Sequence, residues 1–351
     1  MFCRIPLELN YRLDNLGGEI MKAFVHYKVP GMDGTSYSDI DEIEPKQGEV
    51  KVKLKSAGLN HRDLFVLHRH KETDPPLVIG SDGAGIVEAV GPSVEGVQVG
   101  DEVILNPSLG WKEKSDAPPE GHEILGLPDH GTFAEKITLS ADNVGPKPAH
   151  LSWDEAGVLS LAAMTAYRAL FTRANVKPTD TVLLPGIGSG AVTFLLLFAK
   201  AIGARVIVTS RSEAKLKQAL ELGADVAIDS NGNWNEALNG EKVDIVVETI
   251  GAATFHKSLG QLRKGGKMVT FGASAGDSVD FNLREFFYGQ YTLLGSTMAS
   301  TEEFNEMLQF VNQHKIKPVI DKVYPLEETK KAMQRIDEAE QFGKIVIKIA
   351  D

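Results

Sequence analysis

One stretch of the sequence decides the fold: TVLLPGIGSGA at residues 181–191. Residues 181–184 predict a short buried strand, and the apolar run 191–202 predicts a helix. The glycine-rich turn between them has the form G-x-G-x-x-A, which lets the backbone approach a pyrophosphate at the N-terminus of the helix. A plain turn is the alternative. The residues that we expect to bind a dinucleotide here are Gly186, Gly188, Gly190 and Ala191.

From about residue 151 the sequence continues to alternate between short apolar runs and longer runs that end at a glycine. This alternation predicts an α/β fold, a doubly wound parallel sheet of the Rossmann type with helices on both faces. The further expected strands are 205–209, 226–228, 244–247 and 267–271, with a helix at 213–222. Because such sheets bind ligands at the carboxyl ends of their strands, Gly251 and Gly272 are expected to line the cofactor.

The residues that follow the second strand favour NADP(H) as the cofactor. An NAD site has an acidic residue at this point, which binds the ribose 2′-hydroxyl. This chain has Ser210 and Arg211, with Lys215 one helical turn further on. A hydroxyl and two cations suit a 2′-phosphate, which arginine binds through paired hydrogen bonds. Glu213 is the counter-argument, although it also suits the first turn of a helix. The alternative for Arg211 and Lys215 is solvated surface charge.

The chain before residue 150 has a different pattern, with short β-like runs separated by Gly and Pro, as in a small barrel. A polar loop at 106–131 is long enough to be functional. Its Trp111 either stacks on a flat substrate or packs the loop onto the barrel. Residues 1–20 do not read as a secretory signal. We expect them to be a disordered or tag-like extension, with Met1 and Met21 as alternative natural starts.

Composition excludes several classes of protein. Lys and Arg number 37 against 48 Asp and Glu, a net charge of −11. This acidity argues against a nucleic-acid binder and against a polybasic membrane-surface protein. The longest apolar run is too short to cross a bilayer. The one cysteine, Cys3, can form neither an internal disulfide nor a thiolate-rich zinc site, so we expect a cytoplasmic protein.

Seven further motifs support one family. They are AGLNHRD (57–63), GSDGAGIV (80–87), VGDEV (99–103), GTFAE (131–135), AAMTAY (162–167), LGAD (222–225) and GKIV (343–346). With these motifs in this order, the chain from Met21 to Asp351 resembles the medium-chain dehydrogenase/reductase superfamily. The resemblance implies a GroES-like β-barrel catalytic domain (21–150 and 290–351) and a Rossmann NADP-binding domain (151–289), with the active site between them. It also implies a homodimer, in which a strand near 291–294 pairs across the two-fold axis.

The zinc-dependent members of this superfamily have ligands at three positions, and this chain departs from the pattern at each of them. The corresponding residues are Asn60, Ser81 and, near the third position, Leu161. The loop 106–131 also lacks the four cysteines of a structural zinc lobe. Its Gly121-His122-Glu123 stands outside the family's position, and with His130 it is more typical of a solvated loop. We therefore expect no metal.

Without zinc, the chain resembles the quinone oxidoreductase branch. The resemblance implies transfer of hydride from NADPH to a quinone or to the β-carbon of an α,β-unsaturated carbonyl, a small-molecule substrate in either case. The protein then positions the acceptor and stabilises negative charge on its oxygen. Two departures stand out: Phe65 where the branch often has Tyr, and Val192 where the last glycine of the loop is expected.

Three residues are candidates for catalysis. The amide of Asn60 can donate to a substrate carbonyl or to the nicotinamide ribose, unless it only caps a turn. The guanidinium of Arg62 can stabilise an enolate or quinol oxygen, unless it is a surface group. Thr165 lies near the nicotinamide by resemblance. A non-catalytic NADPH-binding protein and an alcohol dehydrogenase-like enzyme remain as alternative functions.

Overall fold

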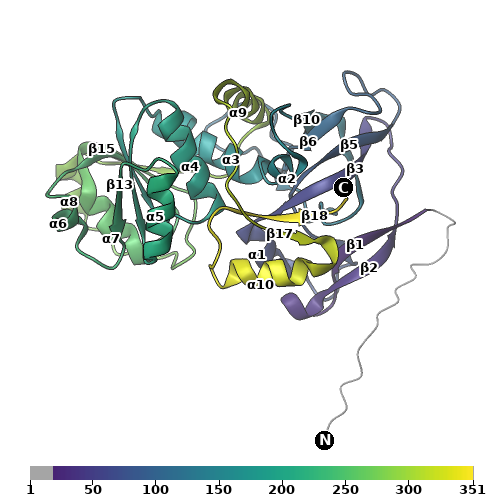
Figure 1. The fold of residues 1–351 in the computed structure, drawn as a ribbon, viewed down its shortest axis with the longest axis horizontal. Helices are drawn as coiled ribbons and strands as arrows, with labels where there is room; N and C mark the ends of the chain where they lie inside the picture. The colour runs from purple at the N-terminus through teal and green to yellow at the C-terminus, as the bar shows by residue number, and fades with distance from the viewer. Residues whose placement is uncertain (1–18, 351) are drawn as a thin grey trace, which may run out of the picture.

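The computed structural model describes residues 19–350, so residues 1–18 of the extension expected at 1–20 lie outside the described part of the chain. Figure 1 shows two lobes side by side, one around a parallel sheet and the other around mostly antiparallel sheets. No helix in residues 19–350 is both long and apolar enough to cross a membrane.

The parallel sheet has the strand order β13-β12-β11-β14-β15-β16. Its strands are β11 (Thr181–Pro185), β12 (Arg205–Ser210), β13 (Val226–Asp229), β14 (Val243–Glu248), β15 (Leu262–Thr270) and β16 (Thr292–Gly295). Its helices are α4 (Gly190–Ala201), α5 (Glu213–Glu221), α6 (Trp234–Ala237), α7 (Ala252–Gln261) and α8 (Leu283–Gly289). The chain direction across the sheet reverses beside β11, and ligands bind at such switch points.

Strand β11 shows why helices cover both faces of this sheet. Val182 and Leu184 belong to one buried cluster with residues of α4, whereas Leu183 belongs to a second cluster with Trp234 and Leu259. Successive side chains of a strand point to opposite faces, and a parallel sheet is buried on both. The α/β fold expected from the sequence is confirmed.

Strand β16 extends the parallel sheet beyond the limit expected at residue 289. It pairs in parallel with β15, from Lys267 opposite Thr292 to Thr270 opposite Gly295. We therefore propose that the Rossmann domain runs from residue 151 to Gly295, and that the catalytic domain resumes after it.

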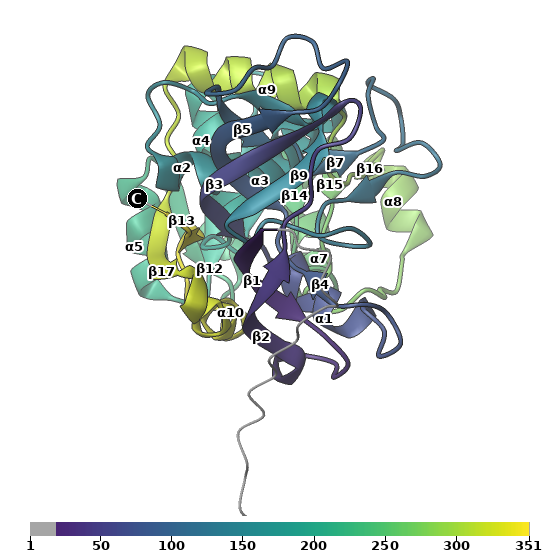
Figure 2. The ribbon, with the colours of Figure 1, turned by 90° about the vertical axis from the view of Figure 1, so that its right-hand side faces the viewer.

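The second lobe contains the GroES-like barrel, shown in front in Figure 2. Its main sheet has the order β10-β6-β5-β3-β18-β17, with β9 also paired to β3, beside sheets β2-β1-β4 and β7-β8. The strands are β1 (Ile20–His26), β2 (Thr35–Asp41), β3 (Glu49–Leu59), β4 (Leu77–Val78), β5 (Asp82–Val90), β6 (Glu102–Leu105), β7 (Ser108–Leu109), β8 (Glu123–Ile124), β9 (Lys136–Ser140), β10 (Val144–Pro146), β17 (Ile320–Pro325) and β18 (Lys344–Lys348).

The helices of the second lobe and of its junction with the first are α1 (His61–Arg69), α2 (Trp153–Gly157), α3 (Ser160–Tyr167), α9 (Thr301–His314) and α10 (Thr329–Asp337). A π-helical segment, η3 (Arg168–Ala174), continues α3. Short 3₁₀ turns are η1 (Met32–Gly34), η2 (Ala141–Asn143) and η4 (Leu326–Glu328).

The two ends of the described chain both belong to the barrel lobe. The C-terminal strand β18 pairs with β3, so that Ile345 lies opposite Leu59. At the other end, Ile20 already pairs with Asp41 in β1 and β2. The fold therefore begins at least one residue before Met21, and Ile20 is not part of an unstructured extension.

Candidate functional site

The turn after β11 has the backbone geometry that its glycines predict. Gly186 has a φ of 77° and Gly188 a φ of 125°, values that side-chain-bearing residues rarely adopt. A Cβ at Gly188 would also lie 2.9 Å from Cδ of Lys215. Ser189 caps α4, because its hydroxyl accepts a hydrogen bond from the Val192 amide. The loop therefore presents bare backbone at the N-terminus of α4, as a pyrophosphate requires.

The third glycine, Gly190, is explained by a neighbour from the barrel lobe. A Cβ at Gly190 would collide with the side chain of Lys344. The amide of Gly343 donates a 2.9 Å hydrogen bond to the carbonyl oxygen of Gly188. The segment before β18 thus crosses the glycine loop. Ala191, the last residue of the motif, is half-buried in the first turn of α4.

The expected 2′-phosphate residues come together at the carboxyl end of β12. Ser210 is buried, and its hydroxyl accepts a 3.1 Å hydrogen bond from the Ser212 amide. Arg211 is exposed. The Lys215 ammonium donates to the Ala339 carbonyl at 2.7 Å, and burial lowers the pKa of Lys215. Two cations and a hydroxyl therefore lie where the ribose of a dinucleotide on this loop would be expected.

Two further observations fit a dinucleotide at this edge of the sheet. Gly251 follows β14 with a φ of 94°, and at Gly272, after β15, a Cβ would lie 2.6 Å from the Thr249 carbonyl oxygen. The buried Oε1 of Gln341, whose backbone passes the glycine loop, has no hydrogen-bond partner in residues 19–350. An unpaired buried acceptor is costly unless a ligand or water satisfies it.

Asn60 caps helix α1, and its side-chain amide is fully engaged within the protein. Its Nδ2 donates to Asp82 Oδ2 at 2.9 Å, and its Oδ1 accepts from Lys344 Nζ at 2.5 Å. Its backbone amide donates to Asp63 Oδ2 at 2.8 Å. All four side chains are buried. This arrangement favours an orienting role for Asn60 over direct donation to a substrate.

Lys344 is a site residue that we did not predict from the sequence. Its side chain is 3% exposed, and its ammonium donates to three acceptors: the Leu59 carbonyl at 3.0 Å, Asn60 Oδ1, and Asp82 Oδ2 at 3.1 Å. One feature of the sequence points to this buried lysine: Lys344 stands in GKIV, a segment whose other residues predict a buried strand. A lysine is almost never fully buried unless it is paired.

Arg62 places a cation next to one of the positions that hold zinc in zinc-dependent relatives. Its Nη1 donates to Ser81 Oγ at 2.5 Å and to the Leu125 carbonyl at 2.9 Å. Asp63 Oδ1 is 4.0 Å away. The Arg62 side chain is 20% exposed, and burial lowers its pKa. Two acceptors fix Nη1 of this partly exposed side chain, which leaves its other nitrogens free of these two bonds to donate to a bound molecule.

Other candidates are less directly placed. The Thr165 hydroxyl donates to the Leu161 carbonyl of its own helix at 2.7 Å, and no described hydrogen bond joins it to Asn60 or Arg62. Phe65 is 47% exposed. Trp111 is 1% exposed, so of its two alternatives the structure favours packing of the loop over stacking on a substrate.

The three family positions for catalytic zinc do not supply a ligand set. Asn60 and Ser81 are engaged as described, and Leu161 contributes its backbone amide to Asp82 Oδ1 at 2.6 Å. Zinc requires three or four Cys, His or acidic ligands. Nowhere in residues 19–350 do three His, Cys, Asp or Glu side chains form a group that could hold a metal ion. His122 and His130 are bound to different partners, Ser108 and the Val78 amide.

The carboxyl group of Asp63 predicts a pH dependence. Burial raises its pKa from 3.8 to about 6. Between these values the folded protein keeps a proton that the unfolded chain has lost, so this contribution to stability is complete below pH 3.8 and is lost as the pH rises through 6. Asp63→Asn keeps an acceptor for the Asn60 amide but cannot ionise. We expect the free energy of unfolding of the wild type to fall by about 1 kcal/mol more than that of Asp63→Asn when the pH is raised from 5 to 8. Urea unfolding at both pH values measures this difference.

The exposed Asp33 offers a control for this measurement, since its side chain is 91% exposed. The free energy of unfolding of Asp33→Asn should change by the same amount as that of the wild type between the two pH values. An Asp63→Asn variant that also follows the wild type would contradict the predicted ionisation of Asp63.

Comparisons with known proteins agree with this architecture. Residues 186–313 match the family described as zinc-binding dehydrogenase, and residues 46–149 match the alcohol dehydrogenase GroES-like domain. A zinc-type alcohol dehydrogenase-like protein of Schizosaccharomyces pombe is 35% identical, over 94% of this chain and 99% of its own length.

Solved structures give the same result. One, of an NAD-dependent alcohol dehydrogenase, has a TM-score of 0.88 and 37% identity, covering 94% of this chain and 100% of its own. Another, of a variant of the crotonyl-CoA carboxylase/reductase AntE in complex with NADP, has a TM-score of 0.86 and 26% identity, covering 95% of this chain and 96% of its own.

Proposed function

Since this chain belongs to the medium-chain dehydrogenase/reductase superfamily and is an oxidoreductase, we propose that it uses NADPH to reduce an α,β-unsaturated carbonyl or a quinone, without zinc. One observation carries the proposal. Beside the family's zinc positions the protein has the Arg62 guanidinium, fixed by Ser81 and Leu125, in place of a metal ligand set. Alcohol oxidation needs a Lewis acid to lower the pKa of the alcohol, whereas an electrophilic acceptor needs only orientation and charge stabilisation.

A dinucleotide held at residues 186–191 would supply a hydride to the electrophilic carbon of the acceptor, and solvent would supply the proton that completes the reduction. The other tasks belong to the protein. Arg62 donates a hydrogen bond to the acceptor oxygen, on which negative charge develops, and this charge-assisted bond strengthens as the charge grows. Asn60, Asp82 and Lys344 form the buried support at the N-terminus of α1, the helix that carries Arg62.

The cofactor is NADP(H). The complex of AntE with NADP supports this in a relative of the same fold. In this chain the support comes from Ser210, Arg211 and Lys215, and from the absence of an acid at the end of β12 (Arg205–Ser210). Glu213, the counter-argument, is the first residue of α5 and follows the Ser212 cap.

Arg211→Ala tests this cofactor preference. We expect the variant to bind NADPH more weakly by about 1–3 kcal/mol, because it loses a charge-assisted bond to the 2′-phosphate. Binding of NADH should hardly change. Fluorescence titration with each dinucleotide measures both constants, and equal losses for the two would contradict the proposed role. Arg263→Ala is the control in the same domain. Arg263 is exposed and pairs with Asp244 at 2.5 Å, so we expect its replacement to change neither binding constant.

The activity is tested by the initial rate of NADPH and NADH oxidation with an ortho-quinone and with crotonyl-CoA, with EDTA present throughout. Rapid consumption of NADPH and slow consumption of NADH is the expected result. The crotonyl-CoA carboxylase/reductase relative makes an unsaturated thioester a suitable acceptor. Alcohol oxidation that disappears with the chelator would instead support the alcohol dehydrogenase alternative. Tight NADPH binding without turnover of any acceptor would support a binding protein.

We also propose a homodimer formed through β16. It is the edge strand of the parallel sheet, and such an edge has unpaired backbone groups that pair readily with a second copy. Next to it in the chain, α8 exposes large apolar side chains, Leu283 by 69%, Phe287 by 51% and Tyr288 by 65%. We expect Phe287→Arg to convert a dimer to a monomer in light scattering after size-exclusion chromatography. A wild-type monomer would contradict the proposal.

We keep a cytoplasmic location as a proposal, supported by the presence of one cysteine in the whole chain.

A further inference from the structure

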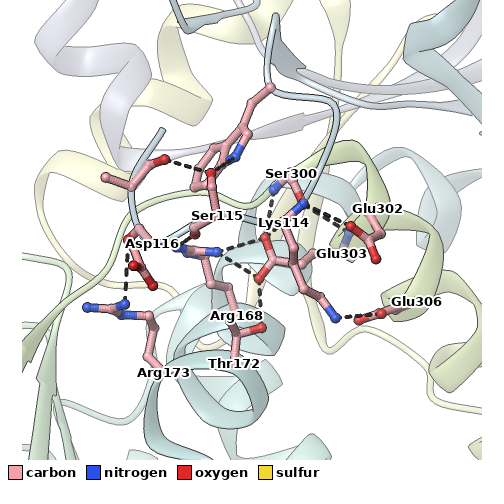
Figure 3. A network of polar contacts seen from close by, with 12 residues as sticks. Lys114, Ser115, Asp116, Arg168, Thr172, Arg173, Ser300, Glu302, Glu303 and Glu306 are labelled. Atoms are coloured by element: carbon pink, nitrogen blue, oxygen red, sulfur yellow. Dashed lines mark hydrogen bonds and ion pairs between the residues drawn. The ribbon is translucent and has the colours of Figure 1, made fainter. Parts of the chain in front are cut away.

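The loop 106–131 is fastened at its tip by a buried arginine of the π-helical segment η3. Arg168 Nη2 donates to the carbonyl oxygens of Ser115 at 2.8 Å and Asp116 at 3.3 Å (Figure 3). The same guanidinium lies 4.6 Å from the ring centroid of Trp111, in a cation–π contact. Arg168 is 2% exposed. One side chain therefore binds the loop both through its backbone and through its aromatic residue.

The arginine is itself held by α9. Nη1 of Arg168 donates to both carboxylate oxygens of Glu303, at 2.8 and 2.9 Å. Glu303 also accepts bonds from Thr172 and from the amide and hydroxyl of Ser300. Although burial alone would raise the pKa of Glu303, these bonds and the charge of Arg168 hold it below its usual value. Arg168 and Glu303 therefore form a buried ion pair in which both carboxylate oxygens accept from one nitrogen, Nη1.

Part of the loop is separated from the barrel by a groove, so its middle has fewer contacts on that side. A groove of about 710 Å³ lies between loop residues, including Leu109 and Glu123, and strand β9 at Thr138–Ser140. On the other side, the loop carbonyls of Trp111 and Lys112 accept hydrogen bonds from the first amides of α9. Asn143 Nδ2 holds the start of the loop by donating to the Asn106 and Ser108 carbonyl oxygens, and the contacts to η3 and α9 fix residues 111–116.

A short series of contacts leads from Arg168 to Arg62. The Trp111 ring meets the His122 ring edge-on, with centroids 5.3 Å apart. His122 directly precedes β8, which pairs with β7 (Ser108–Leu109). The residue after β8 is Leu125, whose carbonyl oxygen accepts from Arg62 at 2.9 Å and from Ser81 at 2.8 Å.

We propose that Arg168 is a positioning residue for the reaction. By holding Trp111 and His122 it fixes the Leu125 carbonyl, and this carbonyl orients the Arg62 guanidinium toward the acceptor. The proposal rests on the proposed function through the role given to Arg62. The loop 106–131 lacks the cysteines of a structural zinc lobe. In this proposal Arg168 orders the loop instead of zinc.

A double-mutant cycle tests the coupling between the two arginines. Arg168→Met should lower kcat for the acceptor roughly 3- to 30-fold and leave KM for NADPH unchanged. In an Arg62→Ala background, Arg168→Met should cause no further loss of kcat. Losses that multiply in the double variant would overturn the proposal. The matched control is Arg205→Met, which breaks an exposed Arg205–Glu241 pair in the parallel-sheet lobe and should not change kcat.

Hydrogen exchange followed by mass spectrometry gives a second readout that needs no turnover. In Arg168→Met the amides of residues 106–131, including Leu125, should exchange faster, while the parallel sheet exchanges as in the wild type. Unchanged exchange at Leu125 would overturn the proposal. If the wild type reduces no acceptor, the proposed function fails, and this exchange measurement still decides whether Arg168 holds Leu125. If Arg168→Met does not fold, Trp111→Leu replaces it, because it breaks the same series of contacts. The same loss of kcat and the same faster exchange at Leu125 are then expected.

Discussion

Replacement of Arg62 by alanine should lower kcat/KM for the electrophilic acceptor by about 100- to 1,000-fold, the loss typical when one preorganised donor to a developing oxyanion is removed. The reason is geometric. Ser81 and Leu125 fix one nitrogen of the guanidinium before any substrate binds, so little reorganisation is needed when charge develops. Binding of NADPH should be unaffected, because Arg62 is not among the residues at the glycine loop. Initial rates with a quinone and with an enone, and NADPH titration, measure the two quantities separately.

Arg69 is the matched control for this prediction. It lies in the same helix, α1, and is exposed, so Arg69→Ala removes an equal charge without removing the proposed oxyanion donor. We expect its kcat/KM to stay within about twofold of the wild type. An Arg62→Ala variant that keeps a third or more of the wild-type kcat/KM would refute the role given to Arg62.

Lys344→Met should be the most destabilising substitution in the site, lowering the free energy of unfolding by about 3–5 kcal/mol. The substitution leaves the Asp82 carboxylate, which is 0% exposed, without its counter-charge. It also removes the donor to Asn60 Oδ1 and to the Leu59 carbonyl. Breaking one partner of a buried pair is costly because the other charge stays buried and uncompensated. Chemical unfolding followed by fluorescence measures the loss.

The exposed pair Lys112–Asp142 provides the control for Lys344→Met. Its two atoms are 2.7 Å apart, closer than the 3.1 Å of Lys344 and Asp82, but the side chains are 75% and 63% exposed. Lys112→Met should not change stability measurably, since solvent already screens the pair. Equal losses for the two variants would show that the buried position of Lys344 has no energetic consequence.

The sequence predicts those parts of the site that depend on local pattern. The glycine loop lies within a few residues of its strand and helix, so residues 181–191 suffice to predict it. Ser210, Arg211 and Lys215 are found in the same way, from their spacing after one strand. The zinc positions can be judged from the sequence because the residue type alone is enough. Asparagine, as at Asn60, is not one of the Cys, His or acidic residues that bind zinc.

The remaining parts depend on contacts between distant segments. Lys344 meets Asp82 across 262 residues of sequence, and Arg168 meets Glu303 across 135. No pattern in either segment specifies the other. For the same reason the sequence could not decide between the two alternatives for Trp111, whose partner Arg168 lies in another element. The sequence identifies Asn60 as a site residue but not its role. Because its Nδ2 and Oδ1 atoms already have partners within the protein, the structure favours an orienting role over donation to a substrate.

The pairing of β18 with β3 sets an order of events during folding. Strand β3 precedes the whole parallel sheet in the chain, whereas β18 follows it. The Rossmann domain can therefore complete its own core during synthesis, while the barrel waits for a contact of very high sequence separation, which is slow to form. Until β18 arrives, Asp82 has no Lys344 beside it, and one edge of β3 is open to other chains at residues 56–59, since β9 already covers residues 49–53. Exposure of that edge makes the nascent barrel, rather than the nucleotide-binding half, the part of the molecule most in need of chaperone protection.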